Sequence, residues 1–301
     1  MTDAAIQVQG LVKAYHGVRA VDGLDLTIPR GEVFALLGPN GAGKSTTVEI
    51  LEGFRGRDAG EVSVLGIDPV MATRSWRERV GIMLQSTSPR SFLNAREALT
   101  HASRLYSNPR DVEEMLDAVG LTDKAEEKPQ ELSGGQRRRL DVALALIGRP
   151  ELVFLDEPTT GFDPEARRQF WRLVESIAAD GTTVLLTTHY LDEADHLADR
   201  IGIISSGRLV ALDTPEGLRR RAAGARVSWR EDGELRTQVT PTPTAVLREL
   251  LERHSGEVEH LEVVHPSLED VYLDLIGDTT AEADAATPPH DTHVADEEGV
   301  A

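Results

Sequence analysis

A glycine-rich segment near the N-terminus combines the residue types that bind phosphate groups. Residues 38–46 read GPNGAGKST and fit the pattern G-x-x-x-x-G-K-[ST]. Gly38, Gly41 and Gly43 permit the tight turn through which backbone N–H groups approach an anion. The apolar run VFALLG precedes the segment and the helix-compatible run TTVEILEG follows it, so the positive end of a helix should face the same anion. This context disfavours a glycine-rich turn without a ligand.

Two side chains complete the expected phosphate site. The Lys44 ammonium should neutralise β- and γ-phosphate oxygens, and the Ser45 hydroxyl should hold Mg²⁺. The residues expected to contact the bound molecule in this segment are Gly38, Pro39, Asn40, Gly41, Ala42, Gly43, Lys44, Ser45 and Thr46.

An acidic pair follows a second apolar run. Residues 152–158 read LVFLDEP, which predicts a buried strand that brings Asp156 to the carboxyl edge of a sheet, beside the phosphate-binding segment. Asp156 is expected to orient Mg²⁺, directly or through water, and Glu157 to accept the proton of an attacking water. An acidic strand end at the surface is the alternative, and the phosphate-binding segment on the same predicted sheet weakens it.

A second glycine motif predicts another helix start that can bind an anion. Residues 132–140 read LSGGQRRRL, in which Ser133 can cap the helix and Gly134 and Gly135 expose backbone N–H groups. Taken locally, an N-capped helix with a flexible entry explains the segment equally well. Arg137–Arg139 would then form a solvated face.

The elements that must position these residues follow from the apolar runs of residues 1–221. VFALLG, LVFL, TVLLTTH and RIGIIS suit strands that are buried on both faces of a parallel sheet, and helical stretches lie between them. The pattern predicts an α/β domain. Residues 85–132 are polar and carry apolar residues at helical spacing, which predicts a helical insertion.

Two further segments follow. Residues 222–277 have strand signals and two helices with apolar stripes, the second starting at a capping box formed by Ser267 and Asp270. We interpret them as a small α+β accessory domain with one thin core and no catalytic constellation. Residues 278–301 carry seven acidic residues and no lysine or arginine, so we expect a disordered acidic tail.

The composition narrows the function classes. The chain has 51 acidic residues against 32 lysines and arginines, a net charge of −19, which argues against binding to nucleic acid. The absence of cysteine excludes disulfides, cysteine zinc sites and thiol nucleophiles. No apolar run approaches the roughly 20 residues that span a bilayer, and the N-terminus lacks the layout of a signal peptide. We expect a cytoplasmic protein that depends on another chain for any membrane span.

The three motifs together carry a resemblance. GPNGAGKST, LSGGQ and LVFLDE, in this order and at this spacing, resemble the ATP-binding cassette (ABC) ATPases, of which LSGGQ is the diagnostic motif. The resemblance covers residues 1 to about 220. It implies a P-loop NTPase cassette with a mixed sheet core, a helical subdomain at about residues 86–150, and ATP with Mg²⁺ as cofactors.

The resemblance also assigns roles to single residues. Tyr15 matches the aromatic residue that stacks on adenine, and His189 matches the switch histidine that contacts the γ-phosphate. Gln85 matches the glutamine that touches Mg²⁺ and the attacking water and links to the membrane part of a transporter. Asp163 falls in the family's D-loop, where leucine is more usual than Phe162. For the tyrosine, the glutamine and the histidine, ordinary structural roles are the alternatives.

In this family two chains face each other head to tail, and each ATP lies between one chain's phosphate loop and the other chain's LSGGQ. The resemblance therefore implies a second copy of the chain as a partner. It also explains why one domain has two helix starts that bind anions. The residues that would contact nucleotide across this dimer are Ser133, Gly134, Gly135, Gln136 and Asp163.

The long match around LSGGQ and the C-terminal segment PSLEDVYLDLIG look like the daunorubicin-resistance branch of ABC exporters. There a free-standing cassette subunit pairs with a separate transmembrane permease subunit. The resemblance implies an ATP-hydrolysing subunit at the inner face of the cell membrane that energises export of a drug, a lipid-like compound or a polysaccharide. A soluble ABC ATPase acting on ribosomes or DNA is the alternative, and a nucleotide sensor without turnover would not need Glu157.

Overall fold

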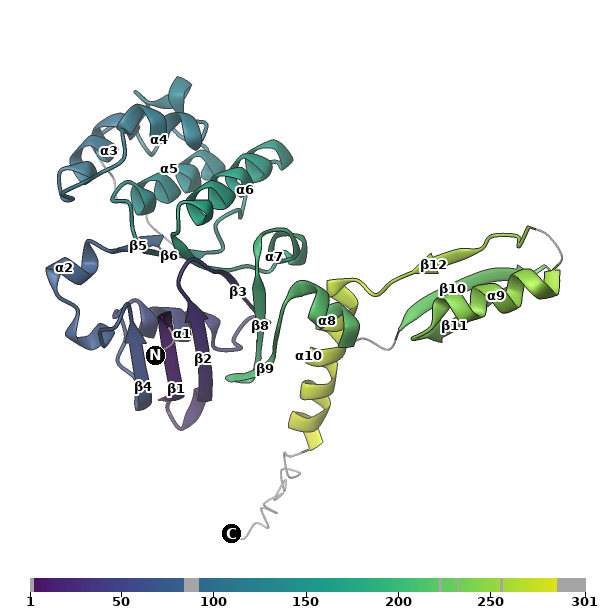
Figure 1. Ribbon diagram of the computed structural model, residues 1–301. Coiled ribbons are helices and arrows are strands. Elements are labelled where there is room, and N and C mark those ends of the chain that lie inside the picture. Colours follow the sequence, from purple (N-terminus) through teal and green to yellow (C-terminus); the bar gives the residue numbers. More distant parts are fainter. Residues whose placement is uncertain (1–2, 84–91, 222–223, 232, 255–256, 286–301) are drawn as a thin grey trace, which may run out of the picture.

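Two sheets and a layer of helices form the body of the protein, and a smaller unit projects from it (Figure 1). The computed structural model describes residues 3–83, 92–221, 224–231, 233–254 and 257–285. Within these residues, no helix is both long enough and apolar enough to cross a bilayer.

The larger sheet carries the predicted catalytic edge. Its strand order is β5-β6-β7-β3-β8-β9, with β9 antiparallel to β8 and the other neighbours parallel. The apolar runs of the sequence form its central strands, and these are buried on both faces because helices and the second sheet cover them. The strands are β3 (Val33–Leu37), β5 (Val80–Met83), β6 (Leu152–Asp156), β7 (Thr183–Thr187), β8 (Arg200–Ser205) and β9 (Arg208–Asp213).

A second, antiparallel sheet covers one face of the first. It has the order β2-β1-β4, and alternate side chains of β2 are buried, as expected for a sheet with one solvated face. One core cluster joins this sheet, helix α1 and one face of the larger sheet, with Ile6, Leu24 and Phe154 among its members. The elements are β1 (Ala4–Tyr15), β2 (Val18–Pro29), β4 (Ala59–Val64) and α1 (Lys44–Leu51).

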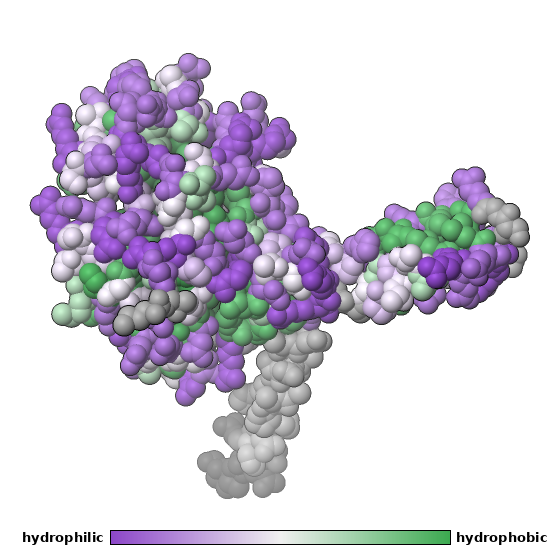
Figure 2. All heavy atoms as spheres, in the orientation of Figure 1, coloured by the Kyte–Doolittle hydropathy of each residue, from purple (hydrophilic) through white to green (hydrophobic). Residues whose placement is uncertain are grey.

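Helices cover the other face, and their core cluster includes Leu99, Leu116 and Leu155. Capping boxes at Asn94 and Ser133 fix the starts of two of these helices. The elements are α3 (Ala95–Ser103), α4 (Val112–Ala118), η2 (Thr122–Lys124), α5 (Gly134–Leu146), α6 (Pro164–Ala179) and α7 (Leu191–Leu197), while η1 (Pro69–Met71) and α2 (Arg74–Arg77) precede β5. On the face drawn in Figure 2, polar side chains cover most of this layer.

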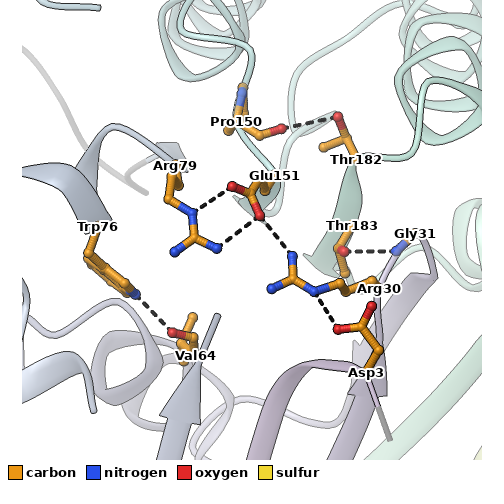
Figure 3. Close-up of polar contacts among 10 residues, drawn as sticks. All are labelled: Asp3, Arg30, Gly31, Val64, Trp76, Arg79, Pro150, Glu151, Thr182 and Thr183. Carbon is orange, nitrogen blue, oxygen red and sulfur yellow. Dashed lines mark hydrogen bonds and ion pairs between the residues drawn. The ribbon is translucent and has the colours of Figure 1, made fainter. Parts of the chain in front are cut away.

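Ion pairs tie the amino ends of the strands together (Figure 3). Arg79, just before β5, donates to Glu151, just before β6, at 2.5 and 2.9 Å. Arg30, just after β2, donates to Glu151 and Asp3, both at 2.8 Å. The two guanidinium groups lower the pKa of Glu151 to about 2. Ion pairs therefore connect the segments at this edge of the sheet. The predicted phosphate-binding and acidic residues lie at the opposite, carboxyl edge.

The projecting unit is a small α+β structure, in keeping with the strand and helix signals of its sequence. Its antiparallel sheet has the order β11-β10-β12, and α9 packs on one face through Val227, Trp229 and Leu250. Apolar side chains are also visible on its surface in Figure 2. The elements are β10 (Ala225–Glu231), β11 (Glu234–Thr240), α9 (Pro243–His254) and β12 (Glu262–Val264), and α8 (Pro215–Arg221) precedes them.

The last helix, α10 (Leu268–Ala285), returns to the body of the protein. It starts at the expected capping box, in which Ser267 N donates to Asp270 Oδ2 at 2.8 Å and Asp270 N donates to Ser267 Oγ at 3.1 Å. Leu268 and Val271 then join the core cluster of the body, beside α7 and α8. The sequence pattern assigns this apolar face to the core of the accessory domain, because a stripe alone does not identify what covers it.

Helix α10 also runs past Gly277 to Ala285. The acidic charge of the sequence predicts disorder from Asp278 onward. Several alanines in 278–285 favour helix instead, and a helix that has already started extends at little cost.

Candidate functional site

The phosphate loop connects β3 to α1 at the carboxyl edge of the larger sheet. A Cβ atom on Gly38 would lie 2.3 Å from the backbone oxygen of Ile204, and one on Gly43 would lie 2.2 Å from that of Ala20. Glycine is therefore required at both positions by close backbone packing. Of the other predicted residues, Pro39, Asn40, Gly41 and Ala42 lie in the loop, and Ser45 and Thr46 lie in the first turn of α1.

Lys44 begins α1 and turns its ammonium back into the loop. Nζ donates to the backbone oxygens of Gly38 at 2.6 Å and of Pro39 at 3.0 Å, and the residue is 8% exposed. Burial lowers the pKa of Lys44, while Glu157 and Asp156 oppose the shift. A phosphate oxygen entering the loop would offer this desolvated cation a negative charge in place of neutral carbonyl groups.

Asp156 ends β6, and the sheet register places it level with Thr187 at the end of β7. Thr187 Oγ1 donates to Asp156 Oδ1, and the N–H of Glu157 donates to the backbone oxygen of Thr187 at 3.0 Å. Burial raises the pKa of Asp156, and the hydrogen bond from Thr187 opposes this. Glu157 has a φ of +46°, a left-handed conformation that is strained in a non-glycine residue and is common at functional sites.

His189 follows β7 and lies beside Glu157. Its Nδ1 is 3.6 Å from Glu157 Oε2, and its side chain is 47% exposed. The imidazole ring packs on Tyr190 with 4.0 Å between the ring centroids, and the guanidinium of Arg167 lies 4.5 Å from the Tyr190 centroid. The predicted base and the predicted switch histidine are therefore brought together by adjacent strand ends.

A pocket of about 230 Å³ between α1 and β6 is the candidate magnesium site. Ser45, Glu49, Glu52 and Asp156 line it, and Ser45 and Asp156 offer a hydroxyl and a carboxylate oxygen, the kinds of donor that Mg²⁺ prefers. Among the described residues, no three His, Asp or Glu side chains gather as a self-sufficient metal cage. Mg²⁺ commonly takes most of its ligands from phosphate and water and only one or two from the protein. Gln85, the third predicted metal contact, lies outside the described residues.

Glu52 is a carboxyl group of this pocket that the sequence motifs do not single out. It is 7% exposed, and burial, with Asp156 and Glu49 nearby, raises its pKa to about 8. At neutral pH the group is therefore mostly protonated. This limits the negative charge that the pocket holds beside Asp156.

Tyr15 lies at the end of β1, on the hairpin that adjoins the phosphate loop where Ala20 meets Gly43. Lys13 Nζ and the guanidinium of Arg55 lie 5.5 and 5.3 Å from its ring centroid. The ring is half-buried and is flanked by cation–π contacts. Its position beside the loop is suited to stacking on the adenine ring of a nucleotide.

The LSGGQ segment forms a capped helix start. Gln136 N donates to Ser133 Oγ at 3.2 Å, and Ser133 N donates to Gln136 Oε1 at 2.8 Å. A Cβ on Gly135 would lie 2.8 Å from the backbone oxygen of Gly161, so α5 starts directly against the segment after β6. In that segment, Asp163 caps α6 by accepting from Glu165 N and Ala166 N.

The three arginines after LSGGQ do not form one solvated face. Arg137 is exposed, whereas Arg138 Nη2 donates to the backbone oxygens of Asp156 and Glu157, and Arg139 Nη1 donates to that of Gly120 at 2.9 Å. The solvated-face alternative is therefore wrong for Arg138 and Arg139. The helical spacing of Arg138 from Gly135 and from the buried Val142 was the available signal.

Glu193 is a second buried acid that sequence reasoning missed. It is completely buried in α7, and its carboxyl group faces the hydroxyls of Thr159 and Thr188. Burial raises its pKa to about 7, and the nearby hydroxyls of Thr188 and Thr159 oppose this shift. Glu193 thus lies beneath both the segment after Glu157 and the segment of His189.

Comparisons with known proteins agree with this geometry. A family model described as ABC transporter matches residues 21–160. Daunorubicin resistance ATP-binding protein DrrA3 of Streptomyces coeruleorubidus is 38% identical over 95% of this chain and 100% of that protein. Nod factor export ATP-binding protein I of Sinorhizobium fredii is 40% identical over 92% of this chain and 87% of that protein.

Solved structures show the same likeness. An ATP-binding subunit of an ABC transporter superimposes with a TM-score of 0.66 and 26% identity, over 72% of this chain and 92% of that one. The dimeric structure of MJ0796, a bacterial ABC transporter cassette, superimposes with a TM-score of 0.62 and 25% identity, over 69% of this chain and 98% of that one.

Proposed function

The chain belongs to the ATP-binding, ATP-hydrolysing cassettes of ABC transporters, and on that premise we propose that it energises an exporter whose membrane-spanning part is a separate subunit. The relatives that cover nearly all of this chain are named for daunorubicin resistance and for Nod factor export. The observation that carries the proposal is the convergence of Lys44, Asp156, Glu157 and His189 at one edge of the sheet.

The side chains divide the proposed hydrolysis between them. Lys44 holds the β- and γ-phosphates, and the loop N–H groups orient them. Glu157 takes a proton from the water that attacks the γ-phosphorus, and the bond to the leaving ADP oxygen breaks. His189 contacts the γ-phosphate beside Glu157. When bound, Mg²⁺ would be held by Ser45 and Asp156 and would neutralise charge on the phosphates.

A second copy of the chain is the proposed partner in this reaction. The capped start of α5 is a second helix start suited to an anion, and it belongs to a different element from the phosphate loop. In a head-to-tail pair, Ser133 to Gln136 of each chain would close the nucleotide site of the other. A related cassette has been solved as a dimer, which supports this arrangement.

The other proposed partner is a membrane permease, which would hold the cassette at the inner face of the cell membrane. Cytoplasmic loops of membrane proteins are rich in lysine and arginine. The chain's net charge of −19 would steer it toward such loops. We therefore expect the association to weaken as salt is raised.

Purification of the full chain from membranes of its host tests this role. We expect a protein with several membrane spans to co-purify with it, and ATP hydrolysis by the pair to stop in a Lys44→Ala chain that still co-purifies. If the chain instead sediments with ribosomes or retains no membrane protein at low salt, the exporter role is wrong although the ATPase stands.

A further inference from the structure

Arg138 joins the LSGGQ helix to the catalytic strand of its own chain. The residue lies in α5, one turn beyond Gly135, and is half-buried. Its Nη2 donates to the backbone oxygen of Asp156 and, at 3.0 Å, to that of Glu157. The side chain thus holds the backbone of the two residues to which the metal and base roles are assigned.

The surroundings of the Arg138 guanidinium favour its contact with the backbone oxygens of Asp156 and Glu157. The guanidinium is partly removed from water, with its Nε atom fully buried, and Asp141, Asp156 and Glu157 contribute negative charge around it. An arginine remains charged in such a place, so breaking the two hydrogen bonds from Nη2 to carbonyl oxygens would be costly for a partly buried cation. If α5 shifts, the guanidinium must keep these partners, and the backbone at the end of β6 must follow.

The start of α5 is stiff enough to transmit such a shift. The capping box between Ser133 and Gln136 fixes its first turn, and Gly135 abuts the backbone of Gly161. The side chain of Arg138 therefore bridges from the turn that presents Ser133 to the end of β6, where Glu157 begins the catalytic segment.

We propose that Arg138 is a positioning residue that couples the two ATP sites of the head-to-tail pair. The inference rests on the proposed function, in which Ser133 of one chain closes over ATP held by the other. Closure at that site moves the start of α5, and Arg138 passes the movement to the backbone of Asp156 and Glu157, which serve the chain's own ATP. Filling one site thereby prepares the base of the other.

Matched substitutions on one helix give the first test, with the full chain and its membrane partner. For Arg138→Gln we expect the Hill coefficient of ATP hydrolysis to fall from near 2 to near 1, and kcat to fall about tenfold, while ATP affinity stays within about twofold. Arg137→Gln, the exposed neighbour, should match the unchanged chain. Arg138→Lys should recover part of the cooperativity because it keeps the charge and one carbonyl contact. An unchanged Hill coefficient in a folded Arg138→Gln chain overturns the proposal.

Mixed dimers with two affinity tags separate coupling from simple loss of structure. One chain carries Lys44→Ala, so that the site closed by the other chain's LSGGQ stays empty, and turnover at the remaining site is measured. With Arg138 in the other chain, emptying that site should lower turnover at least fivefold; with Gln at this position, the drop should be under twofold. Equal factors in both backgrounds overturn the coupling role.

A control distinguishes failure of this inference from failure of the proposed function. If the Glu157→Gln chain forms no dimer with ATP, the sandwich itself is wrong. If that dimer forms, and emptying one site lowers turnover equally with Arg138 and with Gln at position 138, only the role of Arg138 is wrong. The melting temperature of the Arg138→Gln chain shows whether that variant is folded. If it is not folded, the Arg138→Lys chain takes its place in the mixed dimers.

Discussion

The Nδ1 atom of His189 lies 3.6 Å from Oε2 of Glu157, across the ends of two neighbouring strands. Neither side chain is fully buried, and the histidine ring rests on Tyr190. The carboxylate and the imidazole can therefore both reach a water and a phosphate bound at this edge of the sheet. Removing the proton acceptor Glu157 from this pair should therefore abolish ATP hydrolysis and leave ATP binding intact.

Replacing Glu157 by glutamine should stop hydrolysis and keep ATP bound. The amide preserves the shape of the side chain but cannot accept the proton, so we expect kcat to fall by about 100-fold or more. With ATP and Mg²⁺ the variant should elute as a dimer in size-exclusion chromatography with light scattering, and with ADP it should not. Steady-state turnover near that of the unchanged chain would remove Glu157 from the role of base.

Replacing Lys44 by alanine should abolish ATP binding without destabilising the free protein. The ammonium is buried against carbonyl groups, and a buried cation costs desolvation energy, so the melting temperature of the free variant should not fall. The upward shift that saturating ATP gives to the unchanged chain should vanish. Lys124→Ala, a surface substitution, should keep the full shift, and an ATP shift in the Lys44→Ala chain would contradict its role.

The buried Glu193 should make stability fall as pH rises. Its pKa is raised from the ordinary value of 4.5 to about 7, so the folded chain keeps a proton that the unfolded chain has already lost. This contribution is complete below about pH 4.5 and is lost as the pH rises through 7. Glu193→Gln removes the buried charge. The change that this substitution makes in the free energy of unfolding should be about 3 kcal/mol more favourable at pH 8 than at pH 4. Urea unfolding of both chains at the two pH values measures this, with the exposed Glu216→Gln as control; parallel pH profiles would show that Glu193 is not the group responsible.

Helix α10 should stabilise the body of the protein through its inner face alone. Leu268 is 4% exposed and Leu273 is 60% exposed on the same helix. Leu268→Ala should lower the free energy of unfolding by about 2–4 kcal/mol, and Leu273→Ala by less than about 0.5 kcal/mol. Denaturant unfolding gives both values, and equal losses would mean that the contact of α10 with the body does not persist in solution.

Much of the fold follows from local patterns. The phosphate loop and β6 could be predicted because tight turns and buried parallel strands each demand a short, recognisable run of residues. The start of α10 was equally readable, because the reciprocal hydrogen bonds of Ser267 and Asp270 lie within one turn.

Other features depend on contacts between distant segments, which local patterns do not contain. The stripe with Leu268 and Val271 would suit any apolar partner, and the inward turn of Arg138 depends on the carbonyl groups of a strand far along the chain. The proximity of His189 to Glu157 follows from strand order rather than from spacing in sequence. The left-handed backbone conformation of Glu157 could not be predicted either, because glutamate, unlike glycine, does not indicate a positive φ.

The path of the chain around the projecting unit decides what a deletion would do. The chain leaves the body after α8 and comes back in α10, and Leu218, Leu268 and Val271 belong to one core cluster. The unit is therefore an excursion with both ends anchored. Truncation at Arg221 would remove α10 and expose apolar side chains of the body that Leu268 and Val271 cover. Excising 224–264 and rejoining the ends would remove the projecting unit and keep α10, so the last helix matters more to the stability of the body than the unit that precedes it.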